Sequence, residues 1–384
     1  GPVDLPFLML VLMLTGIGVV MVFSASFATA FYVNDNPTYY FMRQLLFAVA
    51  GIAIMYVTSR INYQSYRWMS VFVLGIAFIS LLLVFTPLGW GRAEVGAQRW
   101  VYIGPINFQP SEIAKLGVVL YFASRLSKRN TEKPRRLNPR SVLSGPLGFL
   151  QRIGFLELVP YILILGAVAG LMLLEPHMSG TILILVAGAS ILFAAGIKLY
   201  WFVGGGALAA AGLGFIITAT PYMTSRIELW KDPWSDPLGK GFQTIQSLYA
   251  IGSGGLLGLG LGKSRQKFLY LPEPENDFIF SIVCEELGLV GATVVLILFA
   301  LLIIRGYWIA IHARDRFGAL LVVGFTTLLA VQVFLNIAVV TNFMPTTGIS
   351  LPFFSYGGTA LMIQLIEMGV ILGVSRQIPA PKQG

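Results

Sequence analysis

Hydrophobic residues in this chain occur in long runs that are separated by shorter polar segments. A run of about 20 apolar residues is long enough for an α-helix to cross the hydrocarbon core of a bilayer. The runs predict ten transmembrane helices, at residues 5–30, 41–59, 67–87, 111–126, 157–174, 179–197, 200–220, 278–304, 317–341 and 358–374. The predicted fold is an all-α, polytopic integral membrane protein with a single domain over residues 3–384; Gly1-Pro2 is expected to be a processing remnant.

The composition agrees with this prediction. Charged residues make up 11% of the 384 residues and hydrophobic residues 56%, whereas a soluble domain carries about 25% charge. The single cysteine, Cys284, excludes an internal disulfide and lies in an apolar run, where a buried structural role is expected.

Basic residues predict the orientation of the chain, because cytoplasmic loops of membrane proteins carry an excess of Lys and Arg. The densest basic stretch, SRLSKRNTEKPRRLNPRS, falls in the loop 124–152. With this loop inside, the other strongly basic loops and both termini also face the cytoplasm. The net charge of +9 is thereby explained, and we do not expect nucleic-acid binding.

Two segments predicted on the outer side are unusual. Residues 221–277 are far longer than a typical connection, so this loop is expected to carry structure and function. Residues 342–357, NFMPTTGISLPFFSYG, are too apolar for a solvated loop and too interrupted by Pro and Gly for a spanning helix. A re-entrant or cavity-lining segment before the last helix is expected.

Five carboxylates gather in LPEPENDFIFSIVCEELG, at residues 271–288. Asp277 directly precedes a predicted helix, and two interpretations stay open: it caps that helix, or it acts as a general base. Neighbouring carboxylates beside apolar walls would raise its pKa. Glu285 and Glu286 lie deeper along the helix, where they need buried partners.

Ionisable and aromatic residues are also expected to gather near the outer helix ends. They are Arg43, Arg99, Trp100, Glu112, Lys115 and Arg226. Such a patch suits the phosphate-bearing headgroup of a lipid. The alternatives are an interfacial anchor for Trp100 and a simple i,i+3 ion pair for Glu112 and Lys115.

Two further motifs do not indicate a cofactor site. The glycine-rich stretch 252–264 lacks the spacing of a P-loop, and a bent, closely packed backbone is expected there. Glu175 and His177 are too few ligands for a structural zinc ion. We therefore assign no metal ligands, and a transient divalent ion, Mg²⁺ or Mn²⁺, stays open.

Several long stretches closely resemble the SEDS family (shape, elongation, division and sporulation), which includes RodA, FtsW and SpoVE. The stretches are residues 16–26, 97–116, 225–291 and 346–362. The resemblance covers essentially the whole chain, and MVFSAS and GFQTIQS favour the division or sporulation branch. It implies a peptidoglycan glycosyltransferase that polymerises lipid II at the outer face of the bacterial plasma membrane, with a class B penicillin-binding protein as partner.

The resemblance also assigns individual residues. The essential aspartate of the family's DFIF motif is Asp277 here, and Trp100 and Lys115 occupy two other functionally important positions. One departure precedes the aspartate: Glu275-Asn276 stands where a His-Thr pair is usual. A mechanism that uses this histidine therefore does not transfer to this chain.

The resulting hypothesis is that Asp277 removes the proton from the acceptor hydroxyl of lipid II while the donor's lipid diphosphate leaves. Its charge would be stabilised by Arg43, Arg99, Lys115 and Arg226, together with a divalent ion if one binds. A lipid II flippase and a purely structural membrane scaffold are the alternatives. Polymerisation by the purified protein in detergent separates all three.

Overall fold

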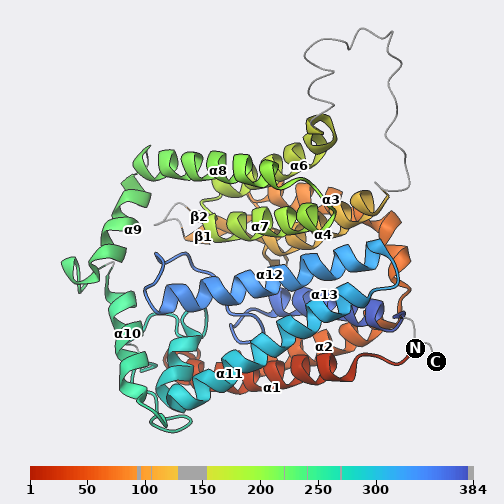
Figure 1. The fold of residues 1–384 in the computed structure, drawn as a ribbon. Coiled ribbons are helices and arrows are strands. Elements are labelled where there is room, and N and C mark those ends of the chain that lie inside the picture. Colours follow the sequence, from red (N-terminus) through yellow and green to blue (C-terminus); the bar gives the residue numbers. More distant parts are fainter. Residues whose placement is uncertain are drawn as a thin grey trace, which may run out of the picture.

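Helices form at all ten positions where the hydrophobic runs predict them. The computed structural model describes residues 1–92, 97–104, 106–128, 154–219, 221–239, 241–268 and 270–378. The ten helices are α1 (Leu5–Asn34), α2 (Tyr39–Arg60), α3 (Tyr66–Leu83), α4 (Pro110–Ser127), α6 (Phe155–Leu174), α7 (Met178–Ala194), α8 (Leu199–Ala219), α11 (Ile279–His312), α12 (Arg316–Val340) and α13 (Gly358–Ser375). They form a bundle of long helices (Figure 1).

Fewer helices meet the length and hydropathy expected of a membrane span than the ten that the sequence predicts. Within the described residues, seven helices are long and apolar enough to cross a membrane: α1, α2, α3 with the preceding turn, α6, α11, α12 and α13. Helix α7 and the first part of α8 are apolar but shorter. Ten spans and the orientation of the bundle therefore stay predictions, and the basic loop 124–152 lies largely outside the described residues.

One end of the bundle is held together by two aspartates at helix starts. Asp4 accepts a hydrogen bond from Phe7 N at 3.0 Å and pairs with Arg305 of α11 at 2.7 Å. Asp315 caps α12 through Gly318 N at 3.1 Å and pairs with Arg67 at 3.1 Å. Each carboxylate thus satisfies a free helix N–H and joins two distant segments.

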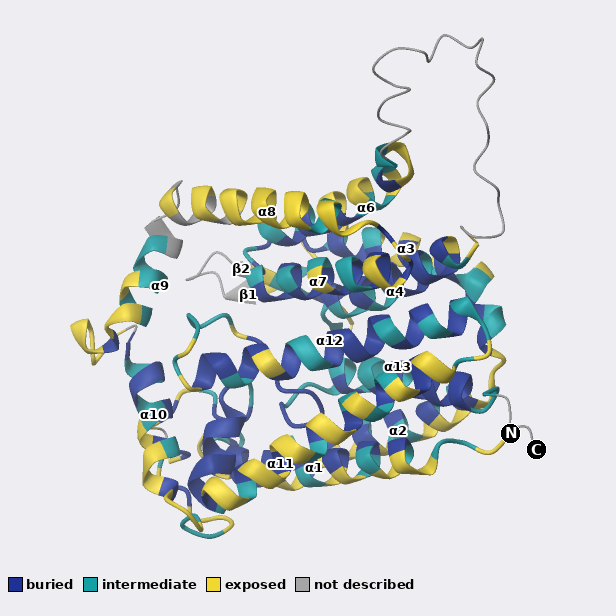
Figure 2. Cartoon of the chain, in the orientation of Figure 1, coloured by how far each residue is buried: buried dark blue, intermediate teal, exposed yellow. Residues whose placement is uncertain are grey.

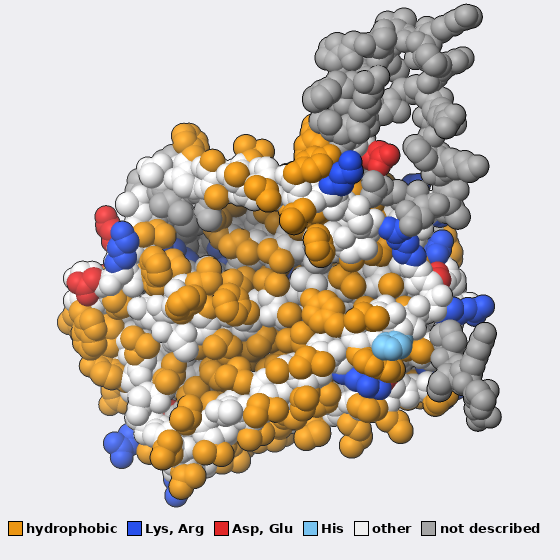
Figure 3. Space-filling view, viewed as in Figure 1, with side chains coloured by type: hydrophobic (Ala, Val, Ile, Leu, Met, Phe, Trp, Pro, Cys, Tyr) orange, Lys and Arg blue, Asp and Glu red, His pale blue; other side chains and the backbone are white. Residues whose placement is uncertain are grey.

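Surface composition matches a bundle embedded in lipid. Side chains on the face in Figure 3 are mainly hydrophobic, and most of its charged residues lie toward the two ends. Nearly all described residues of α8 are exposed (Figure 2). Because lipid-facing helix surfaces are as apolar as buried ones, such exposure is expected where a helix meets lipid or another membrane protein.

Additional elements occupy the segments between these helices. The long segment after α8 contains α9 (Pro221–Lys231) and α10 (Phe242–Gly254), so the expectation that it carries structure is confirmed. The segment before α4 forms a small antiparallel sheet in the order β1 (Gly89–Arg92), β2 (Ala97–Ile103) and β3 (Ile106–Phe108). Trp90 lies opposite Trp100 in this sheet. Sequence analysis missed it, because strands this short give little alternation.

Small residues let the helices of the bundle approach closely. Helix α13 packs along α2, and Gly369 lies at their contact. A β-carbon at Gly369 would lie 1.9 Å from Thr58 Oγ1 and 2.7 Å from the Met55 carbonyl oxygen. The two helices can therefore hold this spacing only with glycine at that position.

We expect Gly369→Ala to destabilise the protein by about 1–3 kcal/mol, because the extra methyl group must push α13 away from α2. Thermal unfolding in detergent measures the change. Gly166→Ala on α6 is the matched control, since no atom lies within 4 Å of its added β-carbon. Equal melting temperatures for Gly369→Ala and the control would contradict the packing argument.

Candidate active site

Asp277 lies in the loop that leads into α11. The helix begins at Ile279, and Phe278 occupies the cap position. The predicted cap position, Asp277, is therefore one residue before the observed one. Its backbone carbonyl accepts a hydrogen bond from Asn336 Nδ2 at 2.8 Å, which ties the loop to α12.

The irregular segment 342–357 passes directly beside Asp277. A β-carbon built at Gly348 would lie 3.8 Å from Asp277 Oδ2 and 3.9 Å from Arg99 Nη1. The carboxylate and the guanidinium thus border the same point of this segment. Gly348 has a φ of +69°, a conformation that favours glycine.

Two amide side chains of α12 hold this segment in place. Asn336 Nδ2 donates to the Ile349 carbonyl at 2.8 Å as well as to that of Asp277. Gln332, one helical turn away, donates to the Ser350 carbonyl at 3.1 Å. Many side chains between Ile349 and Ser355 are buried, so the cavity-lining segment expected from the sequence is confirmed. The roles of these amides were not recognised from the sequence.

Two of the three arginines predicted in the outer patch reach this region. Arg99 on β2 donates to the carbonyl of Pro176, and Arg226 on α9 donates to the carbonyl of Thr346. Ser179 on α7 donates to the Thr347 carbonyl at 3.2 Å. Strand β2, α7 and α9 therefore converge on residues 346–348, next to Asp277.

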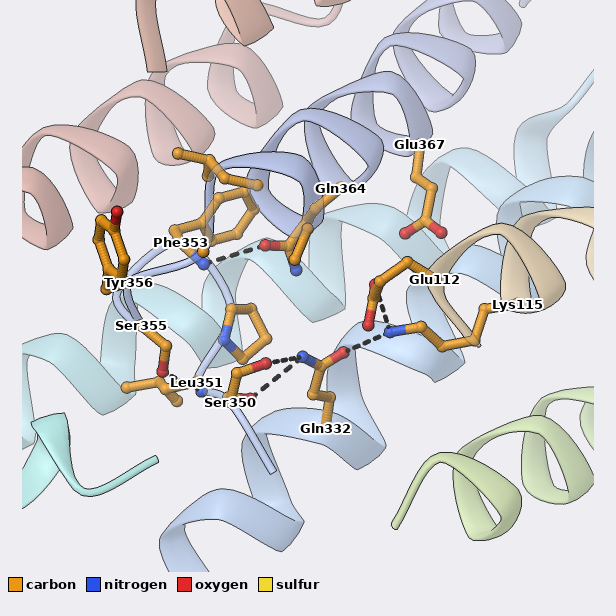
Figure 4. Close-up of a pocket in the computed structure, with 14 residues that line it drawn as sticks. Glu112, Lys115, Gln332, Ser350, Leu351, Phe353, Ser355, Tyr356, Gln364 and Glu367 are labelled. Carbon is orange, nitrogen blue, oxygen red and sulfur yellow. Dashed lines mark hydrogen bonds and ion pairs between the residues drawn. The ribbon is translucent and has the colours of Figure 1, made fainter. Parts of the chain in front are cut away.

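Glu112 and Lys115 form the predicted ion pair, with a 2.7 Å separation, at the start of α4. Only 5% of Lys115 is exposed, and its ammonium also donates to Gln332 Oε1 at 3.3 Å. Figure 4 shows the pair beside a small cavity of about 30 Å³ whose wall includes residues of the 350–357 segment.

A third ionisable group, Glu367 of α13, lines the same cavity (Figure 4). Its side chain is buried, and Oε1 has no hydrogen-bond partner in the described part of the chain. Sequence analysis did not single it out. The signal was available, because a carboxylate in the middle of a predicted span is a functional hypothesis by default.

The remaining two predicted residues lie less centrally. Arg43 is exposed on α2, and its guanidinium donates to the Tyr39 hydroxyl at 2.7 Å. Trp100 is half-buried on β2. The substrate-binding roles of Arg43 and Trp100 stay predictions.

The unusual Glu275 lies buried beside the catalytic candidate. Burial raises the pKa of Glu275 to about 7, its own backbone N–H acts in the opposite direction, and the charge of Asp277 adds to the rise. Near neutral pH this carboxyl group is therefore partly protonated, which limits the negative charge next to Asp277.

The rear carboxylates of the acidic stretch have buried partners, as expected. Glu286 accepts from Lys267 Nζ at 3.1 Å and from Ser24 Oγ at 2.7 Å. Glu285 accepts from Arg265 N at 3.0 Å and from Ser264 Oγ. Both carboxylates therefore hold the glycine-rich loop against α11.

That loop follows the expected bent path. Gly258 and Gly288 both have positive φ, and a β-carbon at Gly258 would lie 2.2 Å from the Glu286 carbonyl oxygen. The glycines are therefore required for close backbone packing.

No group of three His, Cys, Asp or Glu side chains suited to hold a metal ion occurs among the described residues. Use of Mg²⁺ or Mn²⁺ stays a prediction.

Comparison with known proteins agrees with this arrangement. The family model described as "Cell cycle protein", which covers FtsW, RodA and SpoVE, matches residues 5–379. The chain belongs to this family. Stage V sporulation protein E of Bacillus subtilis (strain 168) is 40% identical, over 97% of this chain and 97% of that protein. The probable peptidoglycan glycosyltransferase FtsW of Geobacter sp. (strain M18) is 39% identical, over 98% and 97% respectively.

Solved structures of the family share the fold. One chain from a peptidoglycan synthase complex, studied for the coordination of polymerization and crosslinking, has a TM-score of 0.75 and 28% identity. The match covers 97% of this chain and 98% of that one. The rod shape determining protein RodA of Thermus thermophilus gives a TM-score of 0.68 at 26% identity, over 99% and 98%.

Proposed function

We propose that this family member is a peptidoglycan glycosyltransferase that polymerises lipid II into glycan strands. One observation carries the proposal: Asp277 Oδ2 and Arg99 Nη1 border the same residue, Gly348. Transfer of a sugar from a lipid diphosphate needs a base for the acceptor and positive charge for the leaving group. This juxtaposition supplies both at one place.

The reaction follows from these two charges. Asp277 accepts the proton of the acceptor's GlcNAc 4-hydroxyl while that oxygen bonds to C1 of the donor's MurNAc. The bond between C1 and the diphosphate oxygen breaks with inversion, and the electron pair leaves with the diphosphate. Because a diphosphate leaves without being protonated, a second carboxylic acid, which hydrolysis of an ordinary glycoside uses, is not needed.

Stabilisation of the leaving group falls to the cations. Arg99 and Arg226 converge on residues 346–348. Lys115 on α4 contacts Gln332, which in turn binds the same segment at Ser350. Arg43 is the outlying candidate. A Mg²⁺ or Mn²⁺ ion, if bound, would add charge at the diphosphate, and polymer yield with and without a chelator tests this.

The location and the partner are parts of the same proposal. Helix α11, which Asp277 precedes, starts at the bundle end opposite the start of α1 and the end of α13 (Figure 1). Those two helix ends meet through a hydrogen bond from Asp4 N to Ser375 Oγ at 3.2 Å. Basic loops predict that the site faces the outside of a bacterial plasma membrane. A class B penicillin-binding protein is the proposed partner, and the similarity to a chain of a synthase complex supports it.

The direct experiment supplies lipid II to the purified protein and its transpeptidase partner in detergent, and follows glycan polymer on a gel. Polymer is expected. Detergent removes the need for a membrane barrier, so a flippase or a scaffold would leave lipid II unpolymerised. Absence of polymer from a folded, partner-bound protein would contradict the proposal.

Loss of either converging arginine is expected to weaken the reaction. We expect Arg99→Gln and Arg226→Gln each to lower kcat/KM by about 10- to 100-fold, because a hydrogen bond to a charged group contributes about 1.5–3 kcal/mol. Initial polymerisation rates over a range of lipid II concentrations measure it. Arg60→Gln is the control, since Arg60 is an exposed arginine that donates to Tyr56 on its own helix. Equal losses in all three variants would point to a general charge effect.

A further inference from the structure

The corner between α6 and α7 carries two buried ionisable groups that the proposed reaction does not use. Only 2% of Glu175 is exposed, and neither carboxylate oxygen has a hydrogen-bond partner in the described part of the chain. His177, at the cap position of α7, is also buried, and its Nδ1 has no partner there. Buried polar atoms without partners are rare and call for an explanation.

This corner contacts both halves of the proposed site. The carbonyl of Pro176, between the two ionisable residues, accepts the hydrogen bond from Arg99. Ser179, two residues after His177, donates to Thr347 at 3.2 Å, next to the glycine that borders Asp277. A change of charge in this corner therefore acts most directly on the Arg99 guanidinium.

Of the two groups, only Glu175 titrates near neutral pH. Burial raises the pKa of Glu175 to about 8, against the opposing charge of Arg99. Burial, together with the charges of Arg99 and Lys115, lowers the pKa of His177 to about 3, so the imidazole stays neutral. Glu175 therefore changes from neutral to negative as the pH rises through about 8.

Charged groups on the neighbouring elements leave Arg99 as the main partner. Those elements contribute Arg99 on β2, Glu112, Lys115 and Arg125 on α4, Arg67 on α3, Glu157 at the start of α6, and Arg316 at the start of α12. Glu112 and Lys115 are paired with each other. Arg316 donates to Ala195, at the opposite end of α7. The charge that acts on Glu175 is that of Arg99.

We propose that Glu175 is a positioning residue that controls how much of the Arg99 charge is available to the lipid diphosphate. The inference rests on the proposed function. When protonated, Glu175 leaves the guanidinium to the diphosphate. When ionised, it attracts the same guanidinium, and the diphosphate is bound less tightly.

Binding of a polyprenyl diphosphate to the purified protein in detergent tests this without catalysis. Wild-type affinity is expected to fall about tenfold from pH 6.5 to pH 9.5, the effect of an interaction equivalent to one pKa unit. Glu175→Gln and Glu175→Met should both bind with a nearly constant affinity over this range. Neither substitution removes a hydrogen bond made within the described part of the chain, where both carboxylate oxygens lack partners, so both variants are expected to fold.

Polymerisation by the same preparations adds a second readout. In the wild type KM should rise with pH while kcat stays nearly constant, and the neutral variants should lose the rise in KM. The proposal would be overturned if both neutral variants showed the same pH dependence of binding as the wild type. Loss of binding at every pH in a folded variant would also overturn it. Wild-type protein that shows the pH-dependent binding but makes no polymer would contradict the proposed function and leave this inference standing.

Discussion

Asp277→Asn is expected to lower polymerisation by at least about 10²- to 10⁴-fold while leaving the fold intact. An amide cannot accept the proton of the acceptor hydroxyl, so the oxygen remains a poor nucleophile. The fold should survive, because Asn has nearly the same shape as Asp and the backbone carbonyl of residue 277 keeps its hydrogen bond from Asn336. Polymer formed per unit time from lipid II in detergent measures the effect, and thermal unfolding checks the fold.

Glu273→Gln is the matched control for this variant. Glu273 belongs to the same acidic segment and accepts a hydrogen bond from Asn276 at 3.2 Å. Its loss should change polymerisation by less than about fivefold, because a polar contact at a half-buried site contributes about 1 kcal/mol or less. Full activity in a folded Asp277→Asn variant would exclude this residue as the general base.

Lys267→Met is expected to destabilise the protein by about 3–5 kcal/mol, because it leaves Glu286 as an uncompensated buried charge. Only 2% of Lys267 is exposed, and besides Glu286 its ammonium donates to the Gly262 carbonyl at 2.7 Å. Without it, the glycine-rich loop loses one of its attachments to α11, while Ser264 and Arg265 still donate to Glu285. A denaturant titration in mixed micelles gives the free energy of unfolding.

Two further variants show whether the charge is responsible. Lys263→Met removes an exposed lysine from the same loop and should change stability by less than about 0.5 kcal/mol. Adding Glu286→Leu to Lys267→Met should recover part of the loss, because the unpaired charge is then gone. A double variant less stable than Lys267→Met alone would show that the carboxylate stabilises the loop without its cation.

Much of the bundle was predictable because a spanning helix must be apolar over its whole length. Every predicted run became a helix, and α13 differs from its prediction by a single residue at the C-terminal end. Segment 342–357 was also recognisable, because its prolines and glycines break an otherwise apolar stretch. These signals are local, so they need no knowledge of the neighbouring helices.

The site was predictable only in part. Charge in an apolar chain is conspicuous, and this singled out Asp277, Arg99 and Lys115. Neutral amides are not conspicuous, so the hydrogen bonds by which Asn336 and Gln332 hold segment 342–357 were not predicted. The cap was predicted at Asp277 and lies at Phe278, because a hydrophobic run locates a helix end only to within one or two residues.

By itself the sequence determined that this chain is a membrane-embedded helical bundle of the FtsW, RodA and SpoVE family, with its ionisable residues concentrated in a few segments. Only the tertiary structure decided which of those residues act together. Asp277 and Arg99 are 178 positions apart and meet because α12 holds the segment around Gly348 between them. The physical reason is that the length of a hydrophobic run is a local property of one helix, whereas the pairing of charges depends on how separate helices pack.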